Sequence, residues 1–542
     1  MSSVTTARGK ATGMSSEQRM VIFASSLGTV FEWYDFYIYG TLGVFLAKYF
    51  FSNVPANVGF VFALLAFAAG FAVRPFGALI FGRLGDLIGR KYTFLITMTL
   101  MGVGTFFIGL LPGYATLGIL APILLIAFRL VQGLALGGEY GGAAIYVAEH
   151  APADKRGYYT SWIQTTATLG LFMALLLILG IRTMMGEQAF GEWGWRIPFL
   201  LSSVLLVISI WIRLKLNESP LFQKMVAEGK ASKRPLSEAF GEWKNCKIAL
   251  AALFGATAGE AVIWYGGQFY ALFFLTQTLK VPSVNAQIMI AIALALGTPF
   301  FIFFGWLSDR IGRKPIMLAG FALGALTYFS IFQGLTHFAN PALEKALASS
   351  PVTVTADPGE CSFQFKATGT EKFTTGCDNI KAALVNLSVN YNNIEAPKGT
   401  AASVKIGDQT IAANTPDVAK AIAAAVKSHG YPAGADPAQI NYPMTVLLLT
   451  ILVIYVTMVY GPIAAWLVEL FPTRIRYSGL SLPYHIGNGW FGGFLPATVF
   501  AIVAATGNIY SGLWYPIIIA CMSFVVGLIF LPETKDRDIT KM

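Results

Sequence analysis

The sequence predicts an all-α membrane protein in which twelve transmembrane helices form two pseudosymmetric six-helix bundles, with a small extramembrane α+β insert in the second. Two observations predict it: a composition suited to lipid, and three motifs that recur in the same order. Hydrophobic residues make up 55% of the 542 residues and charged residues only 12%, whereas a soluble domain carries about 25% charged residues. We therefore expect most of the chain to lie in a bilayer.

Twelve apolar stretches are long enough to cross a membrane. A helix needs about 20 mostly apolar residues to span a hydrocarbon core roughly 30 Å thick. Several stretches are longer than that, so we expect tilted helices or helices that extend beyond the lipid. The stretches are residues 20–50, 57–82, 92–111, 116–148, 157–181, 195–216, 247–278, 285–306, 315–336, 443–468, 476–505 and 510–531.

The basic residues indicate the orientation. The net charge is +10, but Lys and Arg gather on alternate connectors, as they do on the cytoplasmic loops of membrane proteins. We therefore expect these charges to set the orientation of the protein in the lipid bilayer rather than to bind nucleic acid. We also expect both termini to lie in the cytoplasm. Residues 1–19 are polar and lack an apolar core, so no cleavable signal peptide is expected. The cytoplasmic clusters begin at Arg83, Lys155, Arg213, Arg310, Arg474 and Lys535.

Three motifs occur twice, after the second, fourth and sixth helix of each half. Such a repeat predicts a duplicated six-helix unit, and a parallel duplication places a substrate site near the middle of the bilayer, between the halves. The pairs are residues 82–91 (GRLGDLIGRK) with 305–314 (GWLSDRIGRK), 146–152 (YVAEHAP) with 466–472 (WLVELFP), and 217–220 (NESP) with 532–535 (PETK).

The repeat also divides the chain. We expect a cytoplasmic tail over 1–19, a first bundle over 20–216, a cytoplasmic linker over 217–246, helices seven to nine over 247–336, a periplasmic insert over 337–442, helices ten to twelve over 443–531 and a cytoplasmic tail over 532–542.

The insert is polar and reads as a small α+β module. Residues 352–355, 362–365 and 403–406 alternate like short strands, and residues 417–429 read as an amphipathic helix ended by Gly430. Cys361 and Cys377 both lie in the insert, and an oxidising external compartment permits a disulfide between them. Cys246 and Cys521 lie elsewhere in the chain and are expected to remain thiols.

The first repeated motif predicts a latch at the cytoplasmic face. Its Asp and Arg flank a turn bounded by glycines, and an Asp near the N-terminus of a facing helix gains from the helix dipole. The alternative is simple retention of positive charge, which needs neither the Asp nor the glycines. The expected gating residues are Gly82, Asp86, Arg90 and Lys91, their counterparts Gly305, Asp309, Arg313 and Lys314, and the motif glutamates Glu149 and Glu469.

This loop, in both halves, resembles the signature loop of the major facilitator superfamily. Further motifs resemble its metabolite:proton symporter family, whose bacterial members carry shikimate, α-ketoglutarate, citrate, or proline and betaine. The resemblance covers the twelve helices and implies the superfamily fold, proton coupling and a place in the inner membrane. The insert departs from the family pattern, so the resemblance implies nothing about its role. The motifs are residues 32–37 (EWYDFY), Arg74-Pro75, 129–133 (RLVQG), 137–139 (GGE) and 193–199 (WGWRIPF).

Ionisable residues in the middle of the bilayer are functional candidates, because each costs about 2.5–3.5 kcal/mol to insert. Asp35 lies near the middle of the first helix and Glu32 lies one turn away on the same face. Arg129 lies near the middle of the fourth helix, and an Asp35–Arg129 pair would let Asp35 exchange its partner for a proton. The alternative is a static bridge between helices. Glu139 is expected to contribute to coupling or gating, unless its glycine neighbours serve helix packing alone.

Arg74 interrupts an apolar stretch and offers a planar fork suited to a carboxylate. We therefore expect an organic anion or zwitterion as the substrate; the alternative for Arg74 is snorkelling toward the headgroups. Trp264 is also a candidate for the substrate site; the alternative for it and the nearby tyrosines is an interfacial or core role. For His485 the alternative is a structural role. The remaining candidates for the substrate site are Arg129, Tyr39, Glu260, Trp264, Gln268 and His485.

The sequence lacks the motifs that are typical of nucleotide hydrolysis, zinc binding and serine nucleophiles. There is no nucleotide-binding P-loop, no zinc-spaced Cys/His cluster and no Gly-x-Ser-x-Gly turn, so we expect no enzyme, no cofactor and no metal. The expected function is symport of protons with a small organic anion or zwitterion by a monomer. The alternatives are an antiporter or facilitator of the same fold, and a nutrient sensor that binds its ligand through the insert.

Overall fold

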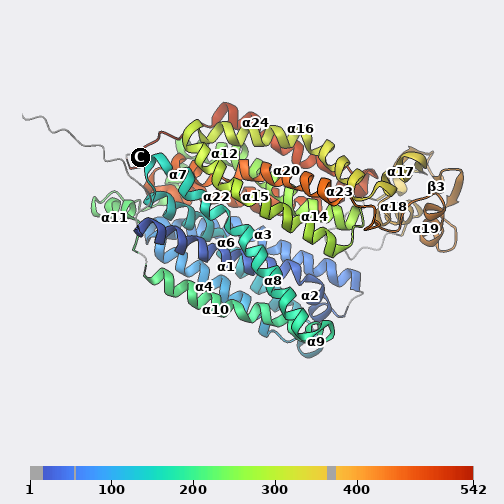
Figure 1. The fold of residues 1–542 in the computed structure, drawn as a ribbon, viewed down its shortest axis with the longest axis horizontal. Helices are drawn as coiled ribbons and strands as arrows, with labels where there is room; N and C mark the ends of the chain where they lie inside the picture. The colour runs from blue at the N-terminus through green and yellow to red at the C-terminus, as the bar shows by residue number, and fades with distance from the viewer. Residues whose placement is uncertain (1–15, 54–55, 216, 363–373, 541–542) are drawn as a thin grey trace, which may run out of the picture.

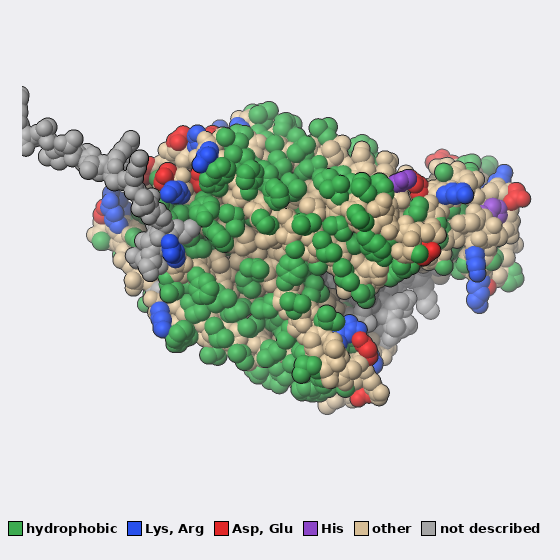
Figure 2. Space-filling view, in the orientation of Figure 1, with side chains coloured by type: hydrophobic (Ala, Val, Ile, Leu, Met, Phe, Trp, Pro, Cys, Tyr) green, Lys and Arg blue, Asp and Glu red, His purple; other side chains and the backbone are tan. Residues whose placement is uncertain are grey.

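The computed structural model of the protein describes residues 16–53, 56–215, 217–362 and 374–540. Two bundles of long helices lie side by side, and the insert projects from one end of the second bundle (Figure 1). Hydrophobic side chains cover the middle of the bundles, whereas charged side chains gather toward the two ends (Figure 2). This distribution matches a protein whose middle lies in lipid.

The first bundle contains six long helical spans. Its helices are α1 (Ser16–Thr41), α2 (Gly43–Phe50), α3 (Ala56–Leu87), α4 (Arg90–Leu110), α5 (Tyr114–Leu117), α6 (Leu120–His150), η1 (Ala153–Lys155), α7 (Arg156–Gln164), α8 (Thr166–Met185), α9 (Glu187–Glu192), η2 (Gly194–Arg196) and α10 (Ile197–Leu214). A short linker follows, with α11 (Pro220–Ala227) and η3 (Ser237–Gly241).

The second bundle repeats this plan with more irregular helices. Its first span contains three π-helical turns, which frequently occur at functional sites. The elements are α12 (Trp243–Ala252), η4 (Leu253–Thr257), α13 (Ala258–Tyr265), η5 (Gly266–Tyr270), α14 (Ala271–Phe273), η6 (Phe274–Thr278), α15 (Ser283–Ile311), α16 (Arg313–Ala339), α20 (Tyr442–Tyr460), α21 (Ile463–Leu470), η8 (Thr473–Ile475), α22 (Arg476–Ile486), η9 (Gly487–Gly492), α23 (Leu495–Thr506), η10 (Ser511–Leu513) and α24 (Trp514–Phe530).

The twelve-helix architecture expected from the sequence is confirmed. Among the described residues, 10 helical spans are long and apolar enough to cross a membrane, and α1 and α3 complete the first bundle. The structure also divides some stretches that read as continuous in the sequence. Residues 20–50 form two helices, α1 and α2, and residues 476–505 change from α22 to a π-helical segment at Gly487.

The insert is a four-stranded sheet with helices packed against it. Its strands are ordered β2-β1-β3-β4, with β1 parallel to β2 and the other neighbours antiparallel. Because parallel strands need a crossover, α18 connects β1 to β2. The elements are α17 (Pro341–Ser349), β1 (Val352–Ala356), η7 (Pro358–Glu360), α18 (Gly376–Asn386), β2 (Tyr391–Glu395), β3 (Ser403–Ile406), β4 (Gln409–Ala412) and α19 (Val418–Ser428).

Two of the strands expected in the insert, at 352–355 and 403–406, are present, and the helix expected over 417–429 is α19. The third expected strand, at 362–365, lies outside the described residues except for Ser362. The sequence did not predict β2, because only Tyr391 of this strand is buried and no apolar alternation marks it.

The insert is attached to the second bundle through backbone contacts. The backbone N–H of Tyr391 donates to the carbonyl of Gly507 at 2.9 Å, and the backbone N–H of Ala435 donates to the carbonyl of Lys280 at 3.1 Å. Gly507 has φ +76°, and a Cβ there would lie 2.6 Å from the Tyr391 ring, so this approach requires glycine. Asn340 adds a bond from its side chain to the carbonyl of Leu279 at 2.9 Å. These contacts predict that the insert moves together with the second bundle.

A disulfide joins Cys361 and Cys377, which are 16 residues apart. Closing a loop of this length stabilises a fold by about 3 kcal/mol. We therefore expect the double variant Cys361→Ser/Cys377→Ser to lower the free energy of unfolding of the insert by about 3 kcal/mol, while transport by the bundles continues. Hydrogen exchange of β1 and β3 in the full-length protein measures this, with Cys246→Ser as the control. Unchanged exchange in the double variant would contradict the assignment.

Candidate functional site

A carboxylate at the end of α3 holds the start of α22. Asp86 accepts hydrogen bonds from the backbone N–H groups of Tyr477 (3.1 Å) and Ser478 (2.8 Å). These N–H groups lie in the first turn of α22, where backbone donors have no partner within the helix and the dipole favours negative charge. Arg90 lies 3.2 Å from the same carboxylate and donates to the carbonyl of Thr473 at 2.7 Å. The contact therefore ties the first bundle to the second.

The same arrangement recurs with the bundles exchanged. Asp309, at the end of α15, accepts hydrogen bonds from the backbone N–H groups of Gly157 and Tyr158, both at 2.8 Å. These residues begin α7 of the first bundle. Arg313 lies 2.7 Å from the Asp309 carboxylate. Each copy of the repeated loop thus places its Asp at a helix N-terminus of the opposite bundle.

Two glutamates form buried ion pairs, and each makes one pair that crosses between the bundles. Glu149 lies 2.7 Å from Arg476, and Glu469 lies 2.7 Å from Arg156 and 3.0 Å from Arg313. All five side chains are buried. Removing one partner from a buried pair leaves an uncompensated charge, which is strongly destabilising. These pairs therefore stabilise the arrangement in which this end of the bundles is closed.

The third repeated motif supports the same region. The carboxylate of Glu218 accepts a bond from the backbone N–H of Lys91 at 3.1 Å, and that of Glu533 accepts one from Lys314 at 3.0 Å. Each carboxylate thus holds the first turn of the third helix in its half. The next motif residue continues the pattern: Ser219 donates to Glu149, and Thr534 donates to Glu469 at 2.6 Å.

Glycines in the repeated loops allow the bundles to approach. A Cβ at Gly305 would lie 2.7 Å from the carbonyl oxygen of Gly157, and a Cβ at Gly82 would lie 3.1 Å from the Cα of Ser478. The sequence predicts a gating role for these glycines, and the structure places both at bundle contacts. We call the charged side chains of this region the inter-bundle network. It comprises Asp86, Arg90, Glu149, Arg156, Asp309, Arg313, Glu469 and Arg476.

A second group of polar side chains lies between the bundles, away from this network. Arg74 of α3 is 5% exposed and interacts electrostatically with Glu260 of α13 and His485 of α22, which are fully buried. Glu260 accepts a hydrogen bond from Asn488 at 2.9 Å. Arg74 also interacts electrostatically with the Tyr265 side chain. The structure therefore brings a guanidinium of one bundle close to a carboxyl and an imidazole of the other.

Aromatic rings line the same interface. Trp33 of α1 lies 5.3 Å from Trp264 of α13 between ring centroids, and Tyr37 stacks on Phe269 at 5.9 Å. Trp264 also contacts Tyr265 at 4.8 Å. We call these five residues the aromatic cluster. Its rings come from both bundles.

Gln268 lies in η5, next to Phe269 of the aromatic cluster, and is 7% exposed. The structure thus places Glu260, Trp264 and Gln268 on one broken helix.

A stack of tyrosines extends from this interface. Tyr140 of α6 stacks on Tyr484 of α22 with ring centroids 3.8 Å apart. The hydroxyl groups of Tyr484 and Tyr460 lie 3.0 Å apart, and Gln164 donates to the Tyr140 hydroxyl at 2.7 Å. The stacked rings thus join a hydrogen-bonded pair of the first bundle, Gln164 and Tyr140, to one of the second, Tyr484 and Tyr460.

Asp35 and Arg129 lie inside the first bundle at the two ends of a hydrogen-bond chain. Thr105 donates to Asp35 at 3.0 Å, Gln132 donates to Thr105 at 2.7 Å, and Arg129 donates to Gln132 at 2.7 Å. The direct pair that the sequence suggested is therefore replaced by a bridged one. Tyr39, like Arg129 a candidate for the substrate site, has its ring 4.1 Å from the Arg129 guanidinium.

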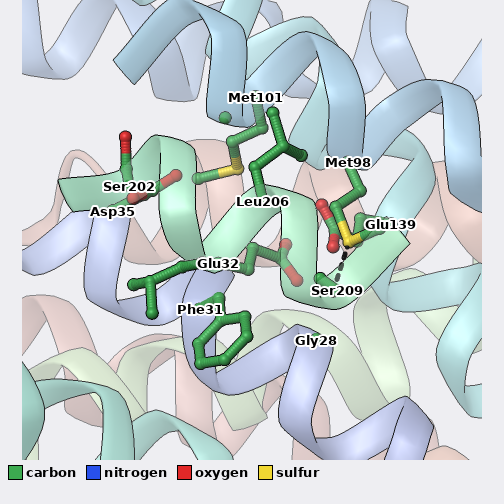
Figure 3. Close-up of a pocket in the computed structure, with 12 residues that line it drawn as sticks. Gly28, Phe31, Glu32, Asp35, Met98, Met101, Glu139, Ser202, Leu206 and Ser209 are labelled. Carbon is green, nitrogen blue, oxygen red and sulfur yellow. Dashed lines mark hydrogen bonds between the residues drawn. The ribbon is translucent and has the colours of Figure 1, made fainter. Parts of the chain in front are cut away.

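Glu32 and Glu139 also lie within the first bundle rather than at its interface with the second. Both line a small cavity together with Asp35, Ser202 and Ser209 (Figure 3). The cavity offers about 20 Å³ to the centre of a water molecule, which is enough for one water. Three carboxyl groups thus share one buried compartment.

Sequence reasoning missed several of these residues. Arg213 was assigned to a cytoplasmic connector, but it is only 2% exposed, because α10 continues to Leu214 and Gly28 of α1 leaves space for the guanidinium. Thr105 gave no signal, since single polar residues are common in membrane helices. Gln132 stands in the motif over 129–133, but the motif does not indicate its hydrogen bonds to Arg129 and Thr105. Glu218 and Glu533 did give one: both belong to the third repeated motif.

Comparisons with known proteins agree with this geometry. The family model described as "Sugar (and other) transporter" matches residues 20–253 and 419–542. A Haemophilus influenzae protein, whose name places it among metabolite transport proteins, is 33% identical over 526 residues, covering 96% of this chain and 95% of its own. That alignment therefore includes most of the insert.

Two further relatives are named for their substrates. The shikimate transporter of Escherichia coli is 36% identical over 326 residues, covering 59% of this chain and 73% of that protein. The proline/betaine transporter of Salmonella typhimurium is 38% identical over 310 residues, covering 56% of this chain and 62% of that protein. The alignment thus spans less than two thirds of the length of the latter relative.

The fold resembles that of a solved transporter. The structure of the major facilitator superfamily proton:xylose symporter XylE superposes with a TM-score of 0.64 at 15% identity, covering 97% of this chain and 98% of that chain. The family match covers most of the chain, and the superposition covers nearly all of it. The protein therefore belongs to the sugar (and other) transporter family, shares the fold of the solved symporter and is a membrane transporter rather than an enzyme.

Proposed function

We propose that this transporter imports a small organic anion or zwitterion together with a proton, by alternating access across the bacterial inner membrane. The observation that carries the proposal is the buried chain from Asp35 to Arg129. It places a carboxyl group and a guanidinium inside the bilayer, in the bundle that also supplies Arg74 to the interface. Ionisable groups at this depth are costly unless they serve transport.

The proposed orientation places the inter-bundle network in the cytoplasm and the insert in the periplasm. The insert and the network lie at opposite ends of the molecule (Figure 1). Lys and Arg side chains lie at both ends of the molecule (Figure 2). At the network end the two repeated loops carry Arg83, Arg90, Lys91, Arg310, Arg313 and Lys314, which fits the excess of Lys and Arg on the cytoplasmic side. In this orientation the structure is closed toward the cytoplasm.

The substrate site is proposed at the aromatic cluster. Arg74 offers two parallel donors to a carboxylate, while Glu260 and the faces of Trp33 and Trp264 suit a cationic group. A zwitterion satisfies both sides at once, whereas an ionised dicarboxylate would meet Glu260 with like charge. The proline/betaine transporter among the relatives supports this preference.

Arg74→Lys tests the site. Lysine keeps the charge but loses the planar fork, so one of two charge-assisted hydrogen bonds to the substrate carboxylate is lost. We expect the apparent affinity to fall roughly tenfold or more, because such a bond contributes about 1.5–3 kcal/mol. The Kd of substrate binding, or the KM of uptake in proteoliposomes, measures this change in affinity. Arg182→Lys, at an exposed arginine paired with Glu187, is the matched control, and an unchanged affinity in Arg74→Lys would remove Arg74 from the site.

The function itself is tested by uptake into proteoliposomes with and without an inward proton gradient. The substrate is first chosen from a panel of zwitterions and organic anions by thermal stabilisation, because a bound ligand raises stability by RT ln(1 + [L]/Kd). The proposal requires uptake above equilibrium only when the gradient is imposed. Equal uptake with and without it would indicate a facilitator, a requirement for internal solute would indicate an exchanger, and binding without uptake would indicate a sensor.

A further inference from the structure

A group of charges lies in the first bundle, apart from the proposed substrate site. Glu32 of α1 is 7% exposed, Glu139 of α6 is fully buried, and Arg213 of α10 is 2% exposed. Proton coupling through Asp35 accounts for none of these three side chains. Their burial side by side in an apolar bundle therefore needs its own explanation.

The two glutamates form a carboxyl pair. Their carboxyl groups point toward each other from α1 and α6 (Figure 3), and both side chains line the same small cavity. Within the described residues, no N–H or O–H group donates to either oxygen of Glu139. Two carboxylates that face each other inside an apolar bundle repel each other, which favours a proton on one of them. The pair therefore holds one proton and a net charge of about −1.

Arg213 supplies the opposite charge. It interacts electrostatically with both glutamates, and its guanidinium lies over the Phe94 ring. None of its three guanidinium nitrogens has a hydrogen-bond acceptor within the described part of the chain. A Cβ at Gly28 would lie 1.8 Å from this guanidinium, so glycine is the residue that admits it. The singly protonated pair and Arg213 together are electrically neutral.

The cavity connects this group to Asp35. Its lining includes both glutamates and Asp35, with Ser202 and Ser209 as further polar residues. Space for one water lies among these groups, and a water within hydrogen-bond distance of two carboxyl groups can pass a proton between them.

Other charged and titratable groups face the carboxyl pair from neighbouring helices. They are Arg74 from α3, Asp35 from α1 and Tyr477 from α22. Tyr477 and Tyr146 of α6 also face Arg213.

We propose that Glu32 and Glu139 form a second proton-binding site, balanced by Arg213, which exchanges protons with Asp35 across the cavity. The proposal rests on proton coupling through Asp35 as the proposed function. It makes Arg213 a positioning residue, because Arg213 sets the charge of the pair without contacting the substrate. The transporter thus stores a proton beside its coupling carboxylate.

Arg213→Gln tests the proposal. Without the guanidinium, the remaining negative charge of the pair is uncompensated, so the pair takes up its second proton at higher pH. We expect the midpoint of the pH profile of transport to move upward by about one unit, which is a tenfold change in proton affinity. Arg182→Gln, at an exposed ion pair, is the control.

Infrared spectroscopy provides a second measurement that does not depend on transport. The shared proton gives a band of a protonated carboxyl group, which we expect to disappear in Glu139→Gln, where Glu32 pairs with Arg213, and to intensify in Arg213→Gln. An unchanged band in Glu139→Gln, or an unchanged pH profile in Arg213→Gln, would overturn the proposal. If Asp35→Asn still accumulates substrate, the proposed function fails instead, so the two failures are distinguishable.

Discussion

Asp35→Asn is expected to abolish proton-driven accumulation while substrate exchange continues in part. Asparagine has the shape of aspartate and can still accept the hydrogen bond from Thr105, but it cannot gain or lose a proton. A potential of 100 mV gives about 2.3 kcal/mol for each proton, which corresponds to roughly fiftyfold accumulation. We expect this ratio to fall to about one in the variant. Proteoliposomes loaded with and without internal substrate separate accumulation from exchange.

The matched control for this experiment is Asp154→Asn, which changes an exposed aspartate in a connector. It is expected to accumulate substrate as the unmodified protein does. Concentrative uptake by Asp35→Asn at the unmodified level would show that Asp35 carries no coupled proton. Loss of exchange together with accumulation would instead indicate a structural role for the chain through Thr105 and Gln132.

The double variant Asp86→Asn/Asp309→Asn is expected to open the cytoplasmic end of the transporter. Each carboxylate holds two backbone N–H groups of the opposite bundle and one arginine. Hydrogen bonds to a charged group contribute about 1.5–3 kcal/mol. Loss of charge at both positions should therefore raise the population of the open state roughly tenfold to a hundredfold, and slow transport because the closed state forms less often.

A buried reporter measures this opening. Ser161 is fully buried beside Gly305 at the bundle contact, so Ser161→Cys becomes accessible to a membrane-impermeant maleimide from the cytoplasmic side only when the bundles separate. The background carries Cys246→Ser and Cys521→Ser. Glu187→Gln, at the exposed pair with Arg182, serves as the control. Equal labelling rates in the double variant and the control would show that these carboxylates do not hold the gate.

The sequence was most informative where the duplication repeated a charged pattern. Asp86 and Asp309 stood in matching loops, and each lies at a helix N-terminus of the other bundle. A repeat reports such positions because both copies face the same physical requirement at a shared interface. The glutamates of the second motif likewise pair with arginines across the bundles.

The interior of the first bundle was less predictable. Depth in the membrane marked Asp35 and Arg129, but the rotation of each helix decides which groups meet, and the residues between them are an ordinary threonine and glutamine. Arg213 was misplaced because its sequence neighbours are those of a connector. Its burial depends on Gly28, a residue 185 positions away in the chain.

The insert shows a further limit of prediction from the sequence. Strands with buried alternate residues were predicted, whereas β2 was not, because its side chains are polar and its place in the sheet depends on pairing with β1. Tertiary pairing of this kind leaves little trace in the local sequence.

Direct measurement of proton movement during uptake tests the central claim. Substrate is added to weakly buffered proteoliposomes with no gradient imposed, and the external pH is followed with a glass electrode or dye. Symport predicts alkalinisation that follows substrate entry, is absent in Asp35→Asn, and is abolished by a proton ionophore. Substrate entry without a pH change, or with acidification, would contradict the account.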